Sequence, residues 1–330
     1  MPLHNKLTKA VIPAAGFGTR MLPATKALPK EMLPVAAKPM IQYAVEEAIA
    51  SGIETIVVVI RSRKSILQAH FRRDRELESF LEGRRQVSAA ELLRQFAKLA
   101  ELRYVEQKKP LGLADAISCA RSVMQGEPFV VLLPDVIIDS VQPATEQLIR
   151  AHKRHGGSII AIREIEPQEV ERFGVVGFED AKTLPKHGSV RLTTLAEKPS
   201  PADAPSRFGI FGRYLLEDDI WDAIAKIGCG LRGEVQLTDA LNLLCRKKLV
   251  HGLLFEGRHF DAGNPLGYLM ANIELSLRDP RLALPLREYL SGLQSCSEPR
   301  HSPKLTSDDR SQSDRTQQTG LGEASADRSH

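Results

Sequence analysis

The sequence is poor in cysteine, and the few cysteines that it has are scattered. Its 330 residues contain Cys119, Cys229, Cys245 and Cys296, and no two of them form a Cys-x-x-Cys pair. Disulfide frameworks and zinc sites are built from closely spaced cysteines. The spacing therefore excludes both kinds of site and favours reduced thiols, as in a cytoplasmic protein.

Long hydrophobic runs and a strong charge of one sign are also missing. No apolar run approaches the ~18–20 residues that span a bilayer, and the stretch MPLHNKLTKAVIP lacks the apolar core of a signal peptide. The 45 basic and 41 acidic residues leave a net charge of only +4, which does not indicate nucleic-acid binding. We expect a cytoplasmic protein whose partners are neither nucleic acids nor membranes.

The rest of the sequence is that of a globular α/β protein. Hydrophobic residues make up 42% and charged residues 26%, as in ordinary soluble domains. Apolar runs of strand length at 9–13, 54–60 and 129–135 alternate with helical patterns. The run ETIVVVI has almost no polar residues, as expected for a strand buried on both faces. We predict a Rossmann-like, mixed but mostly parallel sheet flanked by helices.

Two segments depart from this alternation. Residues 173–216 contain short strand patterns separated by turns, which predicts a small β-rich region appended to the sheet. From about residue 296 the chain is dominated by Ser, Asp, Arg, Gln, Thr and Gly, which cannot bury a core. We therefore expect one domain over residues 1–295 and a disordered polar tail over 296–330.

A glycine-containing turn follows the first predicted strand, where parallel sheets bind ligands. Gly16 and Gly18 allow the backbone to approach phosphate oxygens closely, and Arg20 and Lys30 add positive charge. Neither the P-loop nor the dinucleotide-binding pattern fits. From the glycines alone, an anion-binding loop and an ordinary loop with solvated basic residues are equally consistent with the sequence.

The longer string AAGFGTRMLPATKALPKEMLPVAAKPMIQY resembles the signature of the sugar nucleotidyltransferases. More narrowly, it resembles the bacterial UTP–glucose-1-phosphate uridylyltransferases, with Gly-x-Gly-Thr-Arg at 16–20, Pro-Lys-Glu-Met-Leu-Pro at 29–34 and Lys-Pro at 38–39. The resemblance continues to about residue 280. It implies the reaction UTP + α-D-glucose 1-phosphate = UDP-glucose + diphosphate, Mg²⁺ as cofactor, and a homodimer or homotetramer.

The resemblance implies a nucleotide-binding half at about residues 1–140. Its base-reading segment is EQKKPLGLADA, and a Gln side chain offers the donor and acceptor that match the edge of uracil. The family usually has Gly-Leu-Gly-His where this chain has GLADA, a spelling closer to thymidylyltransferases, so dTTP stays open as the substrate. Without the resemblance, Gln107 would be read as a surface residue. The implied nucleotide-binding residues are Ala14, Ala15, Gly16, Gly18, Thr19, Glu31, Gln107 and Gly112, with Arg20 and Lys30 catalytic.

Two acids are implied as metal ligands. Asp135 ends the predicted strand 129–135, and Asp261 comes after the run 250–257. Magnesium is commonly held by one or two carboxylates together with substrate phosphates, so the resemblance implies Mg²⁺ at these residues, with Asp135 also catalytic. Taken alone, Asp135 would be read as a turn aspartate. We expect the nearby Asp139 to be structural.

The strings FGVVGFE, LAEKPS and RGEVQLTDAL resemble the sugar-phosphate half, at about residues 141–280. Lys198 is implied as a catalytic residue that pairs with glucose 1-phosphate. Without the resemblance, Glu197 and Lys198 would be a solvated pair of little energetic value. We expect Thr238 or Asp239 to cap the following helix. The implied sugar-phosphate residues are Gly174, Glu197, Lys198, Gly233, Glu234 and Gln236.

The sequence contains no convincing nucleophilic or zinc site. His152 and His155 are three residues apart on a predicted helix without a third ligand nearby, and no Ser-His-Asp or Cys-His arrangement stands out. This fits direct transfer without a covalent intermediate. A non-catalytic protein that binds sugar nucleotides is the alternative; it should carry damage in the glycine loop, at Lys30 or at the metal acids, and none is visible.

Overall fold

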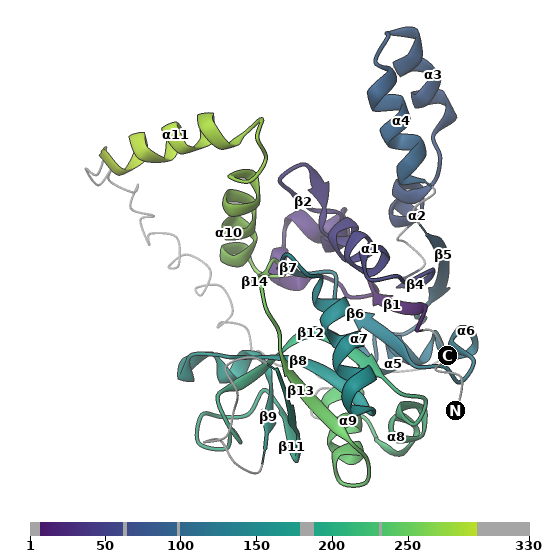
Figure 1. The fold of residues 1–330 in the computed structure, drawn as a ribbon, viewed down its shortest axis with the longest axis vertical. Helices are drawn as coiled ribbons and strands as arrows, with labels where there is room; N and C mark the ends of the chain where they lie inside the picture. The colour runs from purple at the N-terminus through teal and green to yellow at the C-terminus, as the bar shows by residue number, and fades with distance from the viewer. Residues whose placement is uncertain (1–6, 62–64, 98–99, 179–187, 231–232, 296–330) are drawn as a thin grey trace, which may run out of the picture.

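The computed structural model describes residues 7–61, 65–97, 100–178, 188–230 and 233–295. These residues form a ten-stranded central sheet and two small two-stranded sheets (Figure 1). The tail expected at 296–330 and Cys296 lie outside the described residues. The strands of the central sheet are β1 Lys9–Pro13, β4 Thr55–Ile60, β5 Glu101–Glu106, β6 Phe129–Leu132, β8 Ser158–Glu164, β9 Gly174–Gly177, β10 Gly188–Arg191, β11 Thr194–Glu197, β12 Phe208–Leu216 and β13 Val250–Leu254.

The central sheet has the predicted mixed, mostly parallel architecture. Its main path runs β10-β13-β8-β12-β6-β1-β4-β5, with β9 and β11 beside β12. Strands β13, β8, β6, β1, β4 and β5 point in one direction, because β12 is antiparallel to both β8 and β6. The small sheets pair β7 Val136–Asp139 with β14 Arg258–Asp261, and β2 Pro34–Val35 with β3 Lys38–Pro39.

The β-rich segment is more deeply built into the sheet than the sequence predicted. Its last strand, β12, lies in the centre of the sheet between β6 and β8. The sequence FGIFGRYLL is buried along nearly its whole length, and a strand that is apolar on both sides is stable only where both faces are covered. Only β9, β11 and β10 lie to the side or at the edge.

Helices cover both faces of the sheet. Because side chains along each strand point alternately to the two faces, each face has its own apolar cluster. Val11 and Val57 point to one face, which packs against α5, α6, α8 and α9. Ile12 and Ile56 point to the other face, against α1, α2 and α7. The α-helices are α1 Met40–Ala50, α2 Ser65–Phe71, α3 Arg75–Gly83, α4 Val87–Phe96, α5 Leu113–Ser118, α6 Arg121–Met124, α7 Ala144–His155, α8 Ile220–Lys226, α9 Leu237–Cys245, α10 Pro265–Ser276 and α11 Ala283–Ser295.

Two helical pairs extend away from the sheet, α3 with α4 and α10 with α11 (Figure 1). The base of α10 packs on β14 and on the segment after β1, through a third apolar cluster that contains Met21, Phe260 and Ala271. Among the described residues, every helix is too short or too polar to cross a membrane. The third cluster matters for the site, because it packs the segment that carries Arg20 and Lys30 against β14.

Candidate active site

The loop after β1 is folded so that Lys30 passes directly over Gly18. Gly18 has a left-handed backbone, with φ 69°, and a Cβ atom there would lie 3.1 Å from Lys30 Cβ. Thr25 Oγ1 donates to the Gly18 carbonyl at 2.8 Å. Residues 19–32 continue as short 3₁₀ turns at Thr19–Met21, Ala24–Lys26 and Lys30–Met32. The left-handed backbone and the close Lys30 side chain both favour glycine at this position.

Lys30 is paired with Asp135. Its ammonium donates to Asp135 Oδ2 at 2.6 Å, and both side chains are largely buried. Burial alone lowers the pKa of Lys30, but the Asp135 and Glu31 carboxylates outweigh it, so the pKa is raised above its ordinary value. Burial alone raises the pKa of Asp135, but Lys30 and Arg20 outweigh it and hold the pKa below its ordinary value. Both groups are therefore charged near neutral pH.

Arg20 connects the two acids that were predicted to hold a metal. Its guanidinium lies 3.8 Å from Asp135 and 3.7 Å from Asp261. Asp261 follows the run 250–257 as predicted, but it ends a separate strand, β14, that the sequence analysis did not anticipate. The pairing of β14 with β7 places Asp261 opposite Val136, the residue after Asp135. This register brings the two carboxylates together.

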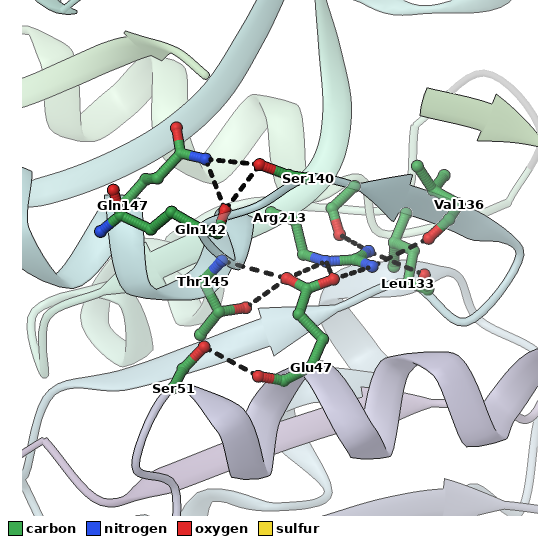
Figure 2. Close-up of polar contacts among 10 residues, drawn as sticks. Glu47, Ser51, Leu133, Val136, Ser140, Gln142, Thr145, Gln147 and Arg213 are labelled. Carbon is green, nitrogen blue, oxygen red and sulfur yellow. Dashed lines mark hydrogen bonds and ion pairs between the residues drawn. The ribbon is translucent and has the colours of Figure 1, made fainter. Parts of the chain in front are cut away.

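Arg213 of β12 forms hydrogen bonds with the residues on either side of the turn that carries Asp135 (Figure 2). Arg213 is 1% exposed, and it donates to the Leu133 carbonyl at 3.0 Å and to the Val136 carbonyl at 2.9 Å. These carbonyls flank Asp135 on both sides. The position of the Asp135 carboxylate is thus set by buried hydrogen bonds as well as by the end of β6.

The pair of carboxylates fits a magnesium ion better than a protein-enclosed metal site. Among the described residues, no group of three or more His, Cys, Asp or Glu side chains is arranged to hold a metal ion. Magnesium keeps several waters and often takes only one or two carboxylates, with substrate phosphates completing its shell. A Cβ atom at Gly263 would lie 2.6 Å from Asp135 Oδ2 and 3.0 Å from Arg20 Nη2. Gly263 therefore leaves the room that this cluster needs.

A cavity of about 290 Å³ opens beside these charges. Lys198 has a left-handed backbone, with φ 45°, which is unusual for a residue before proline, and its main-chain N–H donates to the Phe173 carbonyl at 3.0 Å. Its ammonium lies 3.3 Å from Glu197. The predicted residues that line this cavity are Arg20, Asp135, Gly174, Glu197, Lys198, Glu234, Gln236 and Asp261.

The predicted cap of α9 was wrong. The residue at the N-cap position is Gln236, and its side chain makes no capping hydrogen bond. Thr238 lies inside the first turn and donates from Oγ1 to Glu197 Oε2 at 2.6 Å. Burial, followed by the nearby Glu197 carboxylate, raises the pKa of Asp239. Thr238 therefore orients a carboxylate that lines the cavity.

Gln107 is buried, so its interpretation as a surface residue was wrong. Its Nε2 donates to the Gly112 carbonyl at 3.1 Å and to Asp115 Oδ2 at 2.7 Å. Gly112 has φ 101°, and a Cβ atom there would lie 2.8 Å from the Val235 carbonyl oxygen. This contact joins the predicted base-reading segment to the loop of Glu234.

The remaining predicted residues differ in exposure. Gly16 and Thr19 are exposed, whereas Ala14, Ala15 and Glu31 are buried. Glu31 lies beside Lys30 and helps to raise its pKa. Gly233 does not line the 290 Å³ cavity; its N–H donates to the Gly230 carbonyl at 2.9 Å.

Two residues outside the predicted site are consistent with supporting roles in the fold. Asp139, expected to be structural, forms an ion pair with Arg278. The Nδ1 of His152 hydrogen-bonds the Gly157 carbonyl at 2.9 Å. Both side chains are thus engaged away from the cavity.

Three cavity residues were missed by the sequence analysis. Arg172 lies 3.3 Å from Asp261, and its position directly before FGVVG could have drawn attention to it. Burial, followed by Arg163 and Arg258, lowers the pKa of His259 to about 4, so this imidazole is neutral. Burial, followed by Glu197 and Asp135, raises the pKa of Tyr214. No sequence signal marks His259 or Tyr214, because only the fold brings their strands to the cavity.

Comparisons with known proteins identify the family of this chain. The profile described as nucleotidyl transferase matches residues 9–276, which covers the loop, both acids and the whole cavity. The chain belongs to the nucleotidyl transferase family. In this chain, the segment after β1, the turn after β6 and the end of β14 supply the charged cluster described above.

The relatives match most of this chain. UTP–glucose-1-phosphate uridylyltransferase YngB of Bacillus subtilis is 42% identical over 289 residues, which are 87% of this chain and 96% of that protein. A UTP-bound UGPase from Acinetobacter baumannii superimposes with a TM-score of 0.79 at 34% identity, over 87% of this chain and 99% of the other. A UDP-glucose pyrophosphorylase complexed with UDP-glucose gives a TM-score of 0.74 at 34% identity, over 82% of this chain and 99% of the other.

Proposed function

We propose that this nucleotidyl transferase is a UTP–glucose-1-phosphate uridylyltransferase that converts UTP and α-D-glucose 1-phosphate into UDP-glucose and diphosphate. One observation carries the proposal: Arg20, Asp135 and Asp261, with Lys30 paired to Asp135, share one cavity with Glu197 and Lys198. That arrangement suits two phosphate-bearing substrates that must be brought together. The names and ligands of the relatives support the choice of UTP and glucose.

The reaction needs positioning and charge neutralisation more than proton transfer. An oxygen of glucose 1-phosphate attacks the α-phosphorus of UTP in line; the new O–P bond forms while the bond to the β-phosphate breaks, and its electron pair leaves with diphosphate. The nucleophile is already an anion, so no general base is required. Lys30 and Arg20 neutralise the triphosphate, and Lys198 holds the sugar phosphate against it.

The residues that would hold Mg²⁺ are Asp135 and Asp261. When bound there, the ion would supply positive charge to the phosphates. In the structure these carboxylates are already neutralised by Lys30, Arg20 and Arg172. With Mg²⁺ bound to the carboxylates, these cations would be free to pair with the phosphate oxygens.

The assembly that we propose is a homodimer or homotetramer, and α10 supports it. Leu266, Leu269, Met270 and Ile273 recur at helical spacing and are all exposed, while Ala271 faces the body of the protein. A row of large apolar side chains exposed on a helix indicates a protein interface. The apolar side chains exposed on α11 are Leu284, Tyr289 and Leu293.

The cytoplasm is the compartment that we propose. Cys119, Cys229 and Cys245 are free cysteines in the structure, as expected in a reducing environment.

The decisive test is diphosphate release with Mg²⁺, using UTP or dTTP with glucose 1-phosphate or galactose 1-phosphate. We expect the highest kcat/KM for UTP with glucose 1-phosphate. A preference for dTTP would instead identify a thymidylyltransferase. Absence of release with every pair, in a folded protein that binds UTP, would identify a non-catalytic sugar-nucleotide-binding protein.

A further inference from the structure

The side-chain amide of Gln107 is held in one orientation. Both hydrogens of its Nε2 are directed at acceptors, one at Asp115 Oδ2 and one at the Gly112 carbonyl oxygen. A carboxylate and a carbonyl can only accept hydrogen bonds. If the amide turned over, its Oε1 would face both of these oxygens, so the observed orientation is the favoured one.

This orientation decides what Gln107 offers to a ligand. The amide donors are used inside the protein, and among the described residues no donor is placed on Oε1. Gln107 is 5% exposed, so its amide has little freedom to rearrange. The group is therefore preorganised as a hydrogen-bond acceptor.

The segment around this amide is anchored at both ends. The Gln107 N–H donates to the Ile60 carbonyl at 2.9 Å, at the end of β4. Val235 N–H donates to the Leu111 carbonyl at 2.6 Å, and its carbonyl accepts from the Ala114 N–H at 3.1 Å. The segment is thus fixed beside Glu234 and Gln236, which line the cavity.

We propose that Asp115 is a positioning residue that determines base specificity by holding Gln107 as an acceptor toward the nucleotide base. This inference rests on the proposed function and on the predicted role of Gln107 in reading the base. The N3 atom of uracil carries a hydrogen and can donate to Oε1, whereas the N3 atom of cytosine is itself an acceptor. Two acceptors facing each other in a buried site leave both unpaired. Thymine has the same N3–H as uracil, so Asp115 selects against CTP and not against dTTP.

The test compares UTP and CTP in the wild type and in Asp115→Ala. We expect the wild type to favour UTP over CTP by at least about tenfold in kcat/KM, and the substitution to lower that ratio by about tenfold. The change should appear mainly in the KM for UTP, while kcat and the KM for glucose 1-phosphate stay within about twofold. A general loss of structure would lower activity with both nucleotides and leave the ratio unchanged.

Two further variants keep the test specific. Asp115→Asn preserves the size of the side chain but can donate as well as accept, so it should lower the UTP-to-CTP ratio by less than alanine does. Ser118→Ala on the same helix removes only a hydrogen bond to the Ala114 carbonyl and should leave the ratio unchanged. A ratio that is the same in the wild type and both Asp115 variants would overturn the proposal.

Calorimetric binding of UTP and CTP to the same proteins separates this proposal from the proposed activity. Binding needs no turnover, so a wild type that binds UTP without transferring it would contradict the enzyme function alone. Loss of the UTP preference in Asp115→Ala would still support the role of Asp115. Equal binding of UTP and CTP by the wild type would contradict it.

Discussion

Arg213 and Glu47 form a buried, two-pronged ion pair between the centre of the sheet and α1. The guanidinium donates from Nε to Glu47 Oε1 at 3.0 Å and from Nη2 to Oε2 at 2.8 Å (Figure 2). Glu47 Oε1 also accepts from the N–H and the hydroxyl of Thr145, in the first turn of α7. The pair thus joins β12, α1 and α7, and the same guanidinium contacts the turn of Asp135.

Breaking this pair should destabilise the fold strongly. In Arg213→Met, the Glu47 carboxylate would stay buried without its cation, and the loss of one partner of a buried pair costs about 3–5 kcal/mol. Urea unfolding measures the free energy. The double variant Arg213→Met/Glu47→Leu leaves no unpaired charge, so it should be more stable than the single variant. A single variant as stable as the wild type would contradict this account.

Removing the Lys30 ammonium should greatly slow nucleotidyl transfer. Lys30→Ala loses the cation that pairs with Asp135 and neutralises the triphosphate, and we expect turnover to fall by at least about a hundredfold, as for loss of a key electrostatic group. Asp135→Ala should cause a loss of the same order. Initial rates of diphosphate release measure both effects. Lys153→Ala, at an exposed lysine near the end of α7, is the matched control and should keep full activity.

Gly112 should not tolerate a side chain. Its φ of 101° is strained for any L-residue, and a Cβ atom would lie 2.8 Å from the Val235 carbonyl oxygen. In Gly112→Ala, strain of about 1–3 kcal/mol should displace the segment and raise the KM for UTP by about tenfold or more. Gly228→Ala, at a site with open space around it, is the control. Unchanged kinetics in Gly112→Ala would show that the segment can move without consequence.

The α3–α4 pair should lose stability in acid. Hydrogen bonds from Arg73 and Arg94 lower the pKa of Glu78 to about 2, with Arg73 contributing most. Because the pKa is lower in the folded state, the carboxylate stabilises the fold above its unfolded pKa of about 4.3, and this contribution is lost as the pH falls toward 2. Glu78→Gln should therefore melt at a lower temperature than the wild type at pH 7, and the difference should shrink below pH 4. Glu76→Gln, on the exposed side of α3, should show no such trend.

The apolar face of α10 should control assembly. Leu269→Glu would place a charge in the proposed interface, so light scattering after size exclusion should show a smaller species than the wild type. Leu92→Glu, at an exposed leucine of α4, should assemble like the wild type. A monomeric wild type at micromolar concentration would contradict the proposed oligomer.

Much of the nucleotide side was predictable, because its signals are local. The strand before the glycine loop, α1 and β4 follow from hydrophobic periodicity, and the string from Gly16 to Pro39 carries the family resemblance. The buried strand before Asp135 was predicted from its apolar run, but β6 ends at Leu132, and Asp135 lies in the turn between β6 and β7. The roles of these residues in catalysis remain predictions.

The sugar side was less predictable, because its contacts join distant parts of the chain. Thr238 was assigned to a cap from its position before an apolar helix, but the neighbouring strand β11 brings Glu197 within 2.6 Å and takes its hydroxyl. Arg172, Tyr214 and His259 come to the cavity from three different elements. No local pattern distinguishes them from other polar residues.

By itself, the sequence determined the fold class and the order of most elements, because these depend on periodicity, glycine and short motifs, and it predicted a phosphate-binding segment. The tertiary structure alone decided that β12 enters the centre of the sheet, that β14 pairs with β7, and that Arg213 meets Glu47. Each of these joins residues far apart in the chain. Their pairing is selected by burial and strand register, which no single segment of the sequence contains.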